Sequence, residues 1–147
     1  HLERLLSEAA SIKEFPGFIF PDDARLMNPA SMTGAIAEQL RETGQWASEE
    51  PAVMTKIILD SLAFRYASVV KTLEKLTSES VAGVRIVGGG SQNEYLDQAT
   101  ADACGLPVAA GLGAFACAGL VYNPLADTWS IGGDTDVNYM ARAEKGA

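Results

Sequence analysis

The feature that most constrains the fold is a change of hydrophobic period that follows one long helical stretch. Residues 51–77 place apolar side chains at steps of three and four, which is the spacing of a single helix. Residues 84–87 are then mostly β-branched, and residues 88–90 are three consecutive glycines. A helical stretch over 92–104 and a second short strand over 107–110 complete the pattern. Because strand, turn, helix and strand make a βαβ unit, the sequence predicts an α/β fold with a parallel strand pair.

The long helix is expected to begin at Pro51 and to belong to the core. Its apolar stripe consists of Met54, Ile58, Leu62, Tyr66, Val69, Leu73 and Leu76. Ile57, Phe64 and Val70 widen the apolar surface, so the helix is expected to be buried on more than one side.

Upstream, residues 2–14 are expected to form an amphipathic helix and residues 18–20 a strand or extended segment. Asn28 and Pro29 resemble a helix start, since Asn is a good N-cap and proline fits the first helical position. Gly44 is expected to end that helix, and Gly105 the one after the triple glycine.

Composition excludes several classes of protein. The chain has 147 residues, enough for one domain, and 11 basic against 19 acidic residues leave a net charge of −8. Such a charge disfavours broad binding to nucleic acid or to an anionic membrane, and no apolar run could span a bilayer. One histidine, His1, nearly excludes a Ser-His-Asp triad, and Cys104 and Cys117 suggest neither a zinc site nor a disulfide scaffold. The default compartment is the cytoplasm, and the absence of an initial Met suggests a fragment.

The triple glycine is the candidate binding feature. Gly88, Gly89 and Gly90 let a ligand approach the backbone closely, and the helix behind them offers unpaired N–H groups. Ser91 and Asn93 add polar side chains at the mouth of the turn. The segment lacks the third glycine of a dinucleotide fingerprint and the Lys-Ser/Thr pair of a P-loop. Residue types alone therefore leave two interpretations open, a ligand site and a tight turn that binds nothing.

A resemblance to a known family favours the ligand site. It rests on residues 87–93 (VGGGSQN), Leu96, Gln98, 100–103 (TADA), 105–108 (GLPV), 21–25 (PDDAR), 28–29 (NP), Met32, 41–45 (RETGQ), 58–63 (ILDSLA) and Tyr66. Together these segments resemble the C-terminal domain of the FGGY carbohydrate kinases, over about residues 18–111.

The resemblance implies a ribonuclease H-like, actin-like ATPase fold of two lobes, of which residues 1–147 are a single helix-rich C-terminal lobe. It implies transfer of the γ-phosphoryl group of ATP to a sugar hydroxyl with Mg²⁺, with L-rhamnulose or a related ketose as the expected sugar. Gly89 becomes the first candidate for nucleotide contact, followed by Gly88, Gly90, Ser91 and Asn93.

The same resemblance implies what lies outside the chain. The catalytic aspartate and the sugar-binding residues of the family lie upstream, so this chain is expected to hold no catalytic residue and to be inactive alone. A lobe without its partner exposes apolar surface, so self-association is expected. A nucleotide-binding module without catalysis and a purely structural domain remain as alternatives.

The end of the chain departs from the family pattern. Leu112, Ala114 and Ala116 replace the Pro, Glu and Thr/Ser of the family, Gly119 is kept, and residues 120–147 diverge. Residues 111–119 are small and could form a closely packed helix.

Other residues that could carry chemistry are expected to be structural. The acidic residues are interpreted as turn residues, and no metal site is predicted: Asp22, Asp23, Asp127, Asp134 and Asp136. Cys104 and Cys117 are expected to be small buried side chains, and Trp46 and Trp129 to pack.

Overall fold

The computed structural model describes residues 2–110 and three later strands, over 120–123, 128–131 and 139–141. The elements are α1 (Leu2–Ser11), the 3₁₀ turn η1 (Ala24–Leu26), α2 (Met32–Glu42), α3 (Pro51–Thr77), β1 (Val84–Ile86), the 3₁₀ turn η2 (Gly89–Gln92), α4 (Glu94–Cys104), β2 (Val108–Ala110), β3 (Leu120–Asn123), β4 (Thr128–Ile131) and β5 (Tyr139–Ala141).

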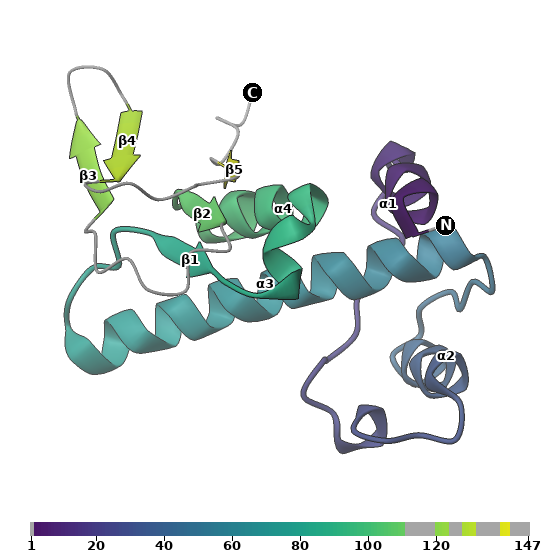
Figure 1. The fold of residues 1–147 in the computed structure, drawn as a ribbon. Helices are drawn as coiled ribbons and strands as arrows, with labels where there is room; N and C mark the ends of the chain where they lie inside the picture. Colours follow the sequence, from purple (N-terminus) through teal and green to yellow (C-terminus); the bar gives the residue numbers. More distant parts are fainter. Residues whose placement is uncertain (1, 111–119, 124–127, 132–138, 142–147) are drawn as a thin grey trace.

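Helix α3 is the long helix against which the other helices lie (Figure 1). Helix α4 and the sheet lie along one side of α3, and α1 and α2 flank its N-terminal part. The predicted bounds of α3 are confirmed, because Pro51 opens the helix and Ser78, in a left-handed conformation, closes it.

The predicted βαβ unit is confirmed. Strands β1 and β2 are parallel, with Val84 opposite Val108 and Ile86 opposite Ala110. Strand β5 pairs with the other edge of β2 in the antiparallel sense, and β3 and β4 form a separate antiparallel pair. The sequence did not predict these three later strands, since no clear hydrophobic period marks them.

Two apolar clusters hold the described residues together. The larger one joins the extended segment before α2 to α2 and α3, through Ile19, Ile36, Leu40, Val53, Met54 and Ile57. The smaller one packs Ala101 of α4 against Val108, with Val84 and Ile86 beside it. Helix α4 therefore covers one face of the parallel pair, as a βαβ crossover should.

The expected burial of α3 on more than one side is correct only for its N-terminal half. The eight buried residues of the helix all lie between Ala52 and Ala67. Val69, Leu73 and Leu76 of the predicted stripe are 39%, 48% and 78% exposed. Phe64, which was expected to widen the buried surface, is 49% exposed although it lies between Ala52 and Ala67. The periodicity identified the helix, but the number of elements available to cover it decided how much of the stripe is buried.

Several boundaries differ from the predictions. Helix α2 begins at Met32, because the Ser31 hydroxyl accepts a hydrogen bond from the Gly34 N–H and caps the helix there. Asn28 and Pro29 precede the helix. Helix α1 ends at Ser11, earlier than expected. For residues 18–20, the second of the two predicted alternatives is correct, since they form an extended segment and not a strand.

Two packing expectations are wrong. Trp46 is 71% exposed, and Cys104 is only half-buried. The turn roles of Asp22 and Asp23 are confirmed, since Asp23 caps η1 and Asp22 pairs with Arg65.

Some expectations fall outside what the structure describes. The segment 111–119 with its departures from the family pattern, Cys117 and the acidic residues Asp127, Asp134 and Asp136 lie outside the described residues, as does the side chain of Trp129. Within the described part of the chain, the helices are too short or too polar to cross a bilayer.

Candidate functional site

The candidate site is the turn that leaves β1 and enters α4. All five residues singled out from the sequence lie in it: Gly88, Gly89, Gly90, Ser91 and Asn93. The turn follows the carboxyl end of β1, which is where ligands bind in open α/β sheets. The structure thus brings the predicted residues together at the predicted place.

Gly88 is a glycine for a conformational reason. Its φ of 83° and ψ of −160° lie in a region that residues with a Cβ rarely adopt. Within the described part of the chain, no atom outside its chain neighbours lies within 4 Å of the position that a Cβ would occupy, so the described residues leave this face of the turn open. A Cβ at Gly90 would meet only Ile86, at 3.9 Å. A ligand therefore has access to the backbone.

Ser91 and Asn93 brace the turn from within. The buried Ser91 hydroxyl donates to the Gly88 carbonyl at 2.7 Å. The Asn93 Oδ1 accepts from the Leu96 N–H at 3.1 Å and so caps α4, while the Asn93 N–H donates to the Gly90 carbonyl at 3.1 Å. The sequence identified both residues as polar groups at the mouth, and the structure shows that both side chains also hold the shape of the turn.

The electrostatics of the turn favour an uncharged part of a ligand. Residues 87–110 contain no Lys or Arg, and Glu94 and Asp97 both lie in the first turn of α4. Carboxylates there interact well with the helix dipole but repel an approaching phosphate. Hydroxyl, amine and ring-nitrogen groups suit the open backbone better.

Asp97 is a functional candidate that the sequence did not reveal. It is fully buried, and neither carboxylate oxygen has a hydrogen-bond partner among the residues that the structure describes. Burial, with a smaller contribution from the Glu94 charge, raises its pKa to about 6. The sequence did contain one indication of this burial. Asp97 lies four residues before the core residue Ala101, and that spacing places both on the helix face that covers the sheet.

Lys56, Asp60 and Tyr95 form a polar network between α3 and the first turn of α4, beside the candidate site. Lys56 Nζ donates to Tyr95 Oη at 2.6 Å, and Tyr95 Oη donates to Asp60 Oδ1 at 2.5 Å. Lys56 and Asp60 also form an ion pair at 3.2 Å. The sequence analysis did not single out these residues, because only the packing of α4 on α3 brings Tyr95 to the other two.

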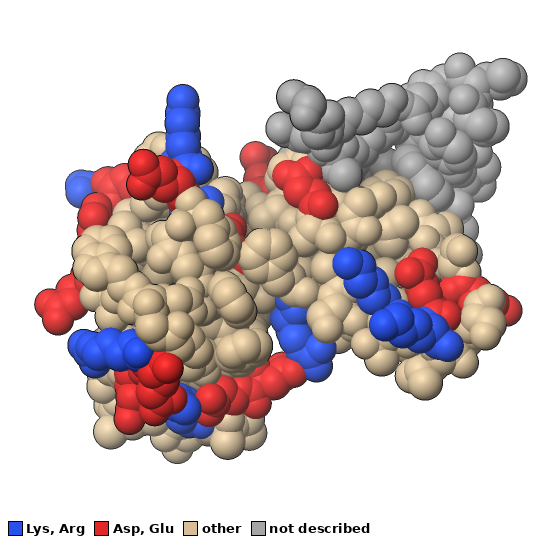
Figure 2. Space-filling model, turned by 180° about the vertical axis from the view of Figure 1, so that it is seen from behind, with Lys and Arg blue, Asp and Glu red and all other residues tan. Residues whose placement is uncertain are grey.

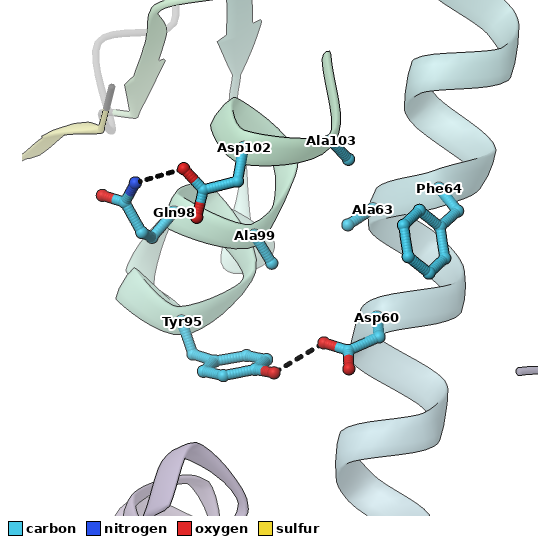
Figure 3. A pocket seen from close by; sticks show the side chains of 8 residues that line it. All are labelled: Asp60, Ala63, Phe64, Tyr95, Gln98, Ala99, Asp102 and Ala103. Atoms are coloured by element: carbon cyan, nitrogen blue, oxygen red, sulfur yellow. Dashed lines mark hydrogen bonds between the residues drawn. The ribbon is translucent and has the colours of Figure 1, made fainter. Parts of the chain in front are cut away.

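A groove of about 390 Å³ lies between the two helices next to this network (Figure 3). The close-up shows Tyr95 pointing from α4 toward Asp60 on α3, with Ala63 of α3 facing α4. The lining is Asp60, Ala63, Phe64, Tyr95, Gln98, Ala99, Asp102 and Ala103.

The described residues do not fit a metal centre. Among them, no group of three or more His, Cys, Asp and Glu side chains is arranged to hold an ion.

The charge pattern of the surface agrees with the composition, since acidic (red) and basic (blue) residues are interspersed on the face in Figure 2 and no basic stripe appears on it.

Comparison with known proteins identifies the family of this chain. Residues 1–121 match the model of the C-terminal domain of the FGGY family of carbohydrate kinases. The chain belongs to this family. The resemblance on which the sequence analysis relied is thereby confirmed, and family membership implies the ribonuclease H-like fold class, with which the helix-rich α/β arrangement and its parallel strand pair agree.

Relatives of this FGGY chain include three bacterial rhamnulokinases. The protein from Bacteroides thetaiotaomicron is 38% identical over 136 residues, which is 92% of this chain and 27% of that protein. Those from Pectobacterium carotovorum and Pectobacterium atrosepticum are 39% and 42% identical over 132 and 110 residues, covering 86% and 75% of this chain. The chain spans only about a quarter of the length of these relatives (27%, 27% and 22%).

Proposed function

We propose that residues 1–147 are a C-terminal lobe that supplies the nucleotide side of an ATP-dependent sugar kinase. The expected reaction transfers the γ-phosphoryl group of ATP to the 1-hydroxyl of L-rhamnulose, giving L-rhamnulose 1-phosphate and ADP. The observation that carries the proposal is the open glycine turn between β1 and α4 in a chain whose relatives are rhamnulokinases.

The turn would contact the nucleotide through its backbone. Gly89, which begins η2, is the first candidate, with Gly88 and Gly90 on either side. The acidic first turn of α4 and the lack of Lys and Arg within residues 87–110 favour contact with the adenine or the ribose over the phosphates, and the nearby Lys56 ammonium is already paired with Asp60. Ser91 and Asn93 would act mainly by holding the turn, because their oxygens are already used within it.

The chemical step would need the rest of the kinase. Phosphoryl transfer depends on positioning and charge stabilisation, and both require groups around the phosphates. The described residues hold no metal centre, so Mg²⁺ would be bound with the phosphates by groups outside them. The expected partners are therefore the sugar, ATP and the remaining part of the polypeptide, and the expected location is the cytoplasm, where ATP is available.

Calorimetric titration of this chain with ADP tests the proposal. We expect saturable binding, and we expect Gly89→Val to weaken it, because a branched side chain would block the approach to the backbone. A coupled assay with ATP, Mg²⁺ and L-rhamnulose should show no turnover by the isolated chain.

Three results would count against the proposal. Absence of both heat and thermal stabilisation at millimolar ADP would favour a purely structural domain, because a ligand that binds only the native state must stabilise it. Unchanged affinity in Gly89→Val would remove the turn as the site. Sugar-dependent turnover by the chain alone would show that the catalytic residue does not lie outside the chain.

A further inference from the structure

We propose that Lys56, Asp60 and Tyr95 form a positioning network that holds the glycine turn in its binding geometry. The inference deepens the proposed function and rests on it, since it takes the turn as the nucleotide contact. None of the three side chains is assigned to contact the nucleotide itself.

The network is a closed triangle of contacts between two helices. The Lys56 ammonium donates to Tyr95 Oη, Tyr95 donates to Asp60, and Lys56 and Asp60 are paired at 3.2 Å. The Lys56 Nζ also lies 5.1 Å from the centre of the Tyr95 ring, within the range of a cation–π contact. Each polar group therefore has two partners, and Tyr95 is held in both position and orientation.

The position of Tyr95 links the network to the turn. Tyr95 is the second residue of α4, two positions after the cap Asn93. Asn93 is tied back to Gly90 through its N–H, and Ser91 to Gly88 through both its N–H and its hydroxyl. Fixing the Tyr95 side chain on α3 therefore fixes the first turn of α4, and this chain of bonds transmits the constraint to Gly88.

Because the network buries two charges, packing of the helices alone does not explain why these residues are present. The side chains of Lys56 and Asp60 are each only 12% exposed, and removing two charges from water is costly even when they are paired. Apolar side chains, such as those of Ala63 and Ala99 that line the adjoining groove, would carry no such desolvation cost. Directional bonds add what apolar contacts lack, which is a single defined position of α4 on α3.

The test uses this chain, ADP and four single variants. Tyr95→Phe removes the hydroxyl, Lys56→Met removes the ammonium but keeps most of the stem, and Lys56→Arg keeps a cationic donor. Tyr66→Phe is the matched control, because it removes a hydroxyl from a half-buried tyrosine of α3 outside the network. Two quantities are measured: amide hydrogen exchange over residues 88–92 without ligand, and the dissociation constant for ADP.

We expect Tyr95→Phe and Lys56→Met to speed exchange in the turn and to weaken ADP binding by about fivefold, a typical size for a residue that acts through its neighbours. Lys56→Arg should restore both, and Tyr66→Phe should change neither. The proposal would be overturned if Tyr95→Phe matched Tyr66→Phe in ADP affinity, even with faster exchange. If the unmodified chain takes up no ADP, the proposed function fails, and exchange in the turn then decides alone whether the network positions it.

Discussion

The side-chain amide of Gln39 pairs with the backbone of Phe20 in both directions. The Phe20 N–H donates to Gln39 Oε1 at 2.6 Å, and Gln39 Nε2 donates to the Phe20 carbonyl at 3.4 Å. Gln45 does the same for Phe18, with both distances at 2.8 Å. Between them, the buried Ile19 donates its N–H to the Ser61 hydroxyl at 2.9 Å. Side chains of α2, the loop after it and α3 thus pair with the backbone N–H and carbonyl groups of residues 18–20, which pair with none of the described strands.

Gln39→Met is expected to destabilise the fold by about 1–3 kcal/mol, because it leaves the Phe20 N–H without its partner and removes the 3.1 Å hydrogen bond from Gln39 Nε2 to Asp23. The Phe20 carbonyl keeps the hydrogen bond that it accepts from the Asp23 N–H. Gln45→Met is the matched control. It removes the same pairing from Phe18 at a more exposed position, where water can replace the lost bonds, so a smaller effect is expected. Urea denaturation of both variants measures the difference. Equal losses would mean that burial of Gln39 adds nothing.

Asp97→Asn is expected to stabilise the chain at neutral pH. The folded-state pKa is raised from 3.8 to about 6, so the folded state binds the proton more tightly than the unfolded state does. The wild-type chain should therefore lose stability as the pH rises from about 4 to about 6, and the cost above pH 6 should be about 1–3 kcal/mol. The neutral amide removes this cost, so its gain should appear above pH 6 and shrink toward pH 4.

Thermal unfolding followed between pH 4 and pH 8 checks this expectation. Asp102→Asn is the control, since it changes the net charge equally from an exposed position of the same helix. The same pH-dependence in both variants would refute the assignment to Asp97.

Gly88→Ala and Gly44→Ala separate backbone strain from ligand contact. Both glycines have positive φ, 83° and 71°, and a Cβ at either would meet no atom within 4 Å. Gly44→Ala should therefore cost about 1–2 kcal/mol of stability through conformation alone. Gly88→Ala should cost about 1–3 kcal/mol, because the combination of φ 83° and ψ −160° is nearly confined to glycine. Only Gly88→Ala should weaken ADP binding, because Gly44 ends α2 outside the glycine turn. Equal ADP affinities, measured by titration, would argue against a role for Gly88 in binding.

Exposed aromatic side chains are expected to drive self-association of the isolated chain. Phe15, Phe18, Phe20 and Trp46 are between 41% and 71% exposed and line one shallow groove. Phe18 and Phe20 alternate with the buried Ile19, so the outer face of the extended segment presents two phenyl rings, 5.6 Å apart. A fixed apolar surface of this kind is typical of a contact site.

The double variant Phe20→Ser, Trp46→Ser should lower the mean mass in sedimentation or light scattering and leave the stability nearly unchanged. Leu76→Ser, at the far end of α3 and 78% exposed, should not change the mass. A chain that is monomeric before any substitution would contradict the expectation.

Local signals were sufficient for much of the fold. Pro51 set the start of α3, Gly44 and Gly105 marked helix ends, and the short β-branched run before the glycines located β1. These signals act within a few residues, through fixed dihedral angles and a change of period, so they can be read without knowing the partners. The predicted start of α2 was wrong because Ser31, and not Asn28, caps the helix.

The residues of the candidate site also fall into those that the sequence revealed and those that it did not. The glycine turn was evident from sequence, because three glycines between a strand and a helix need no distant partner to be recognised. Asp97 and the network of Lys56, Asp60 and Tyr95 were not, since their importance lies in burial and in contacts between residues 35 to 39 positions apart.

By itself, the sequence determined the order of the helices and strands up to β2, the parallel strand pair, the position of the turn and the family. Only the tertiary structure decided which part of α3 is buried, which polar side chains pair with the backbone of residues 18–20, and which carboxylate is buried away from water. The physical reason is that propensity and capping depend on neighbours along the chain, whereas burial and pairing depend on neighbours in space.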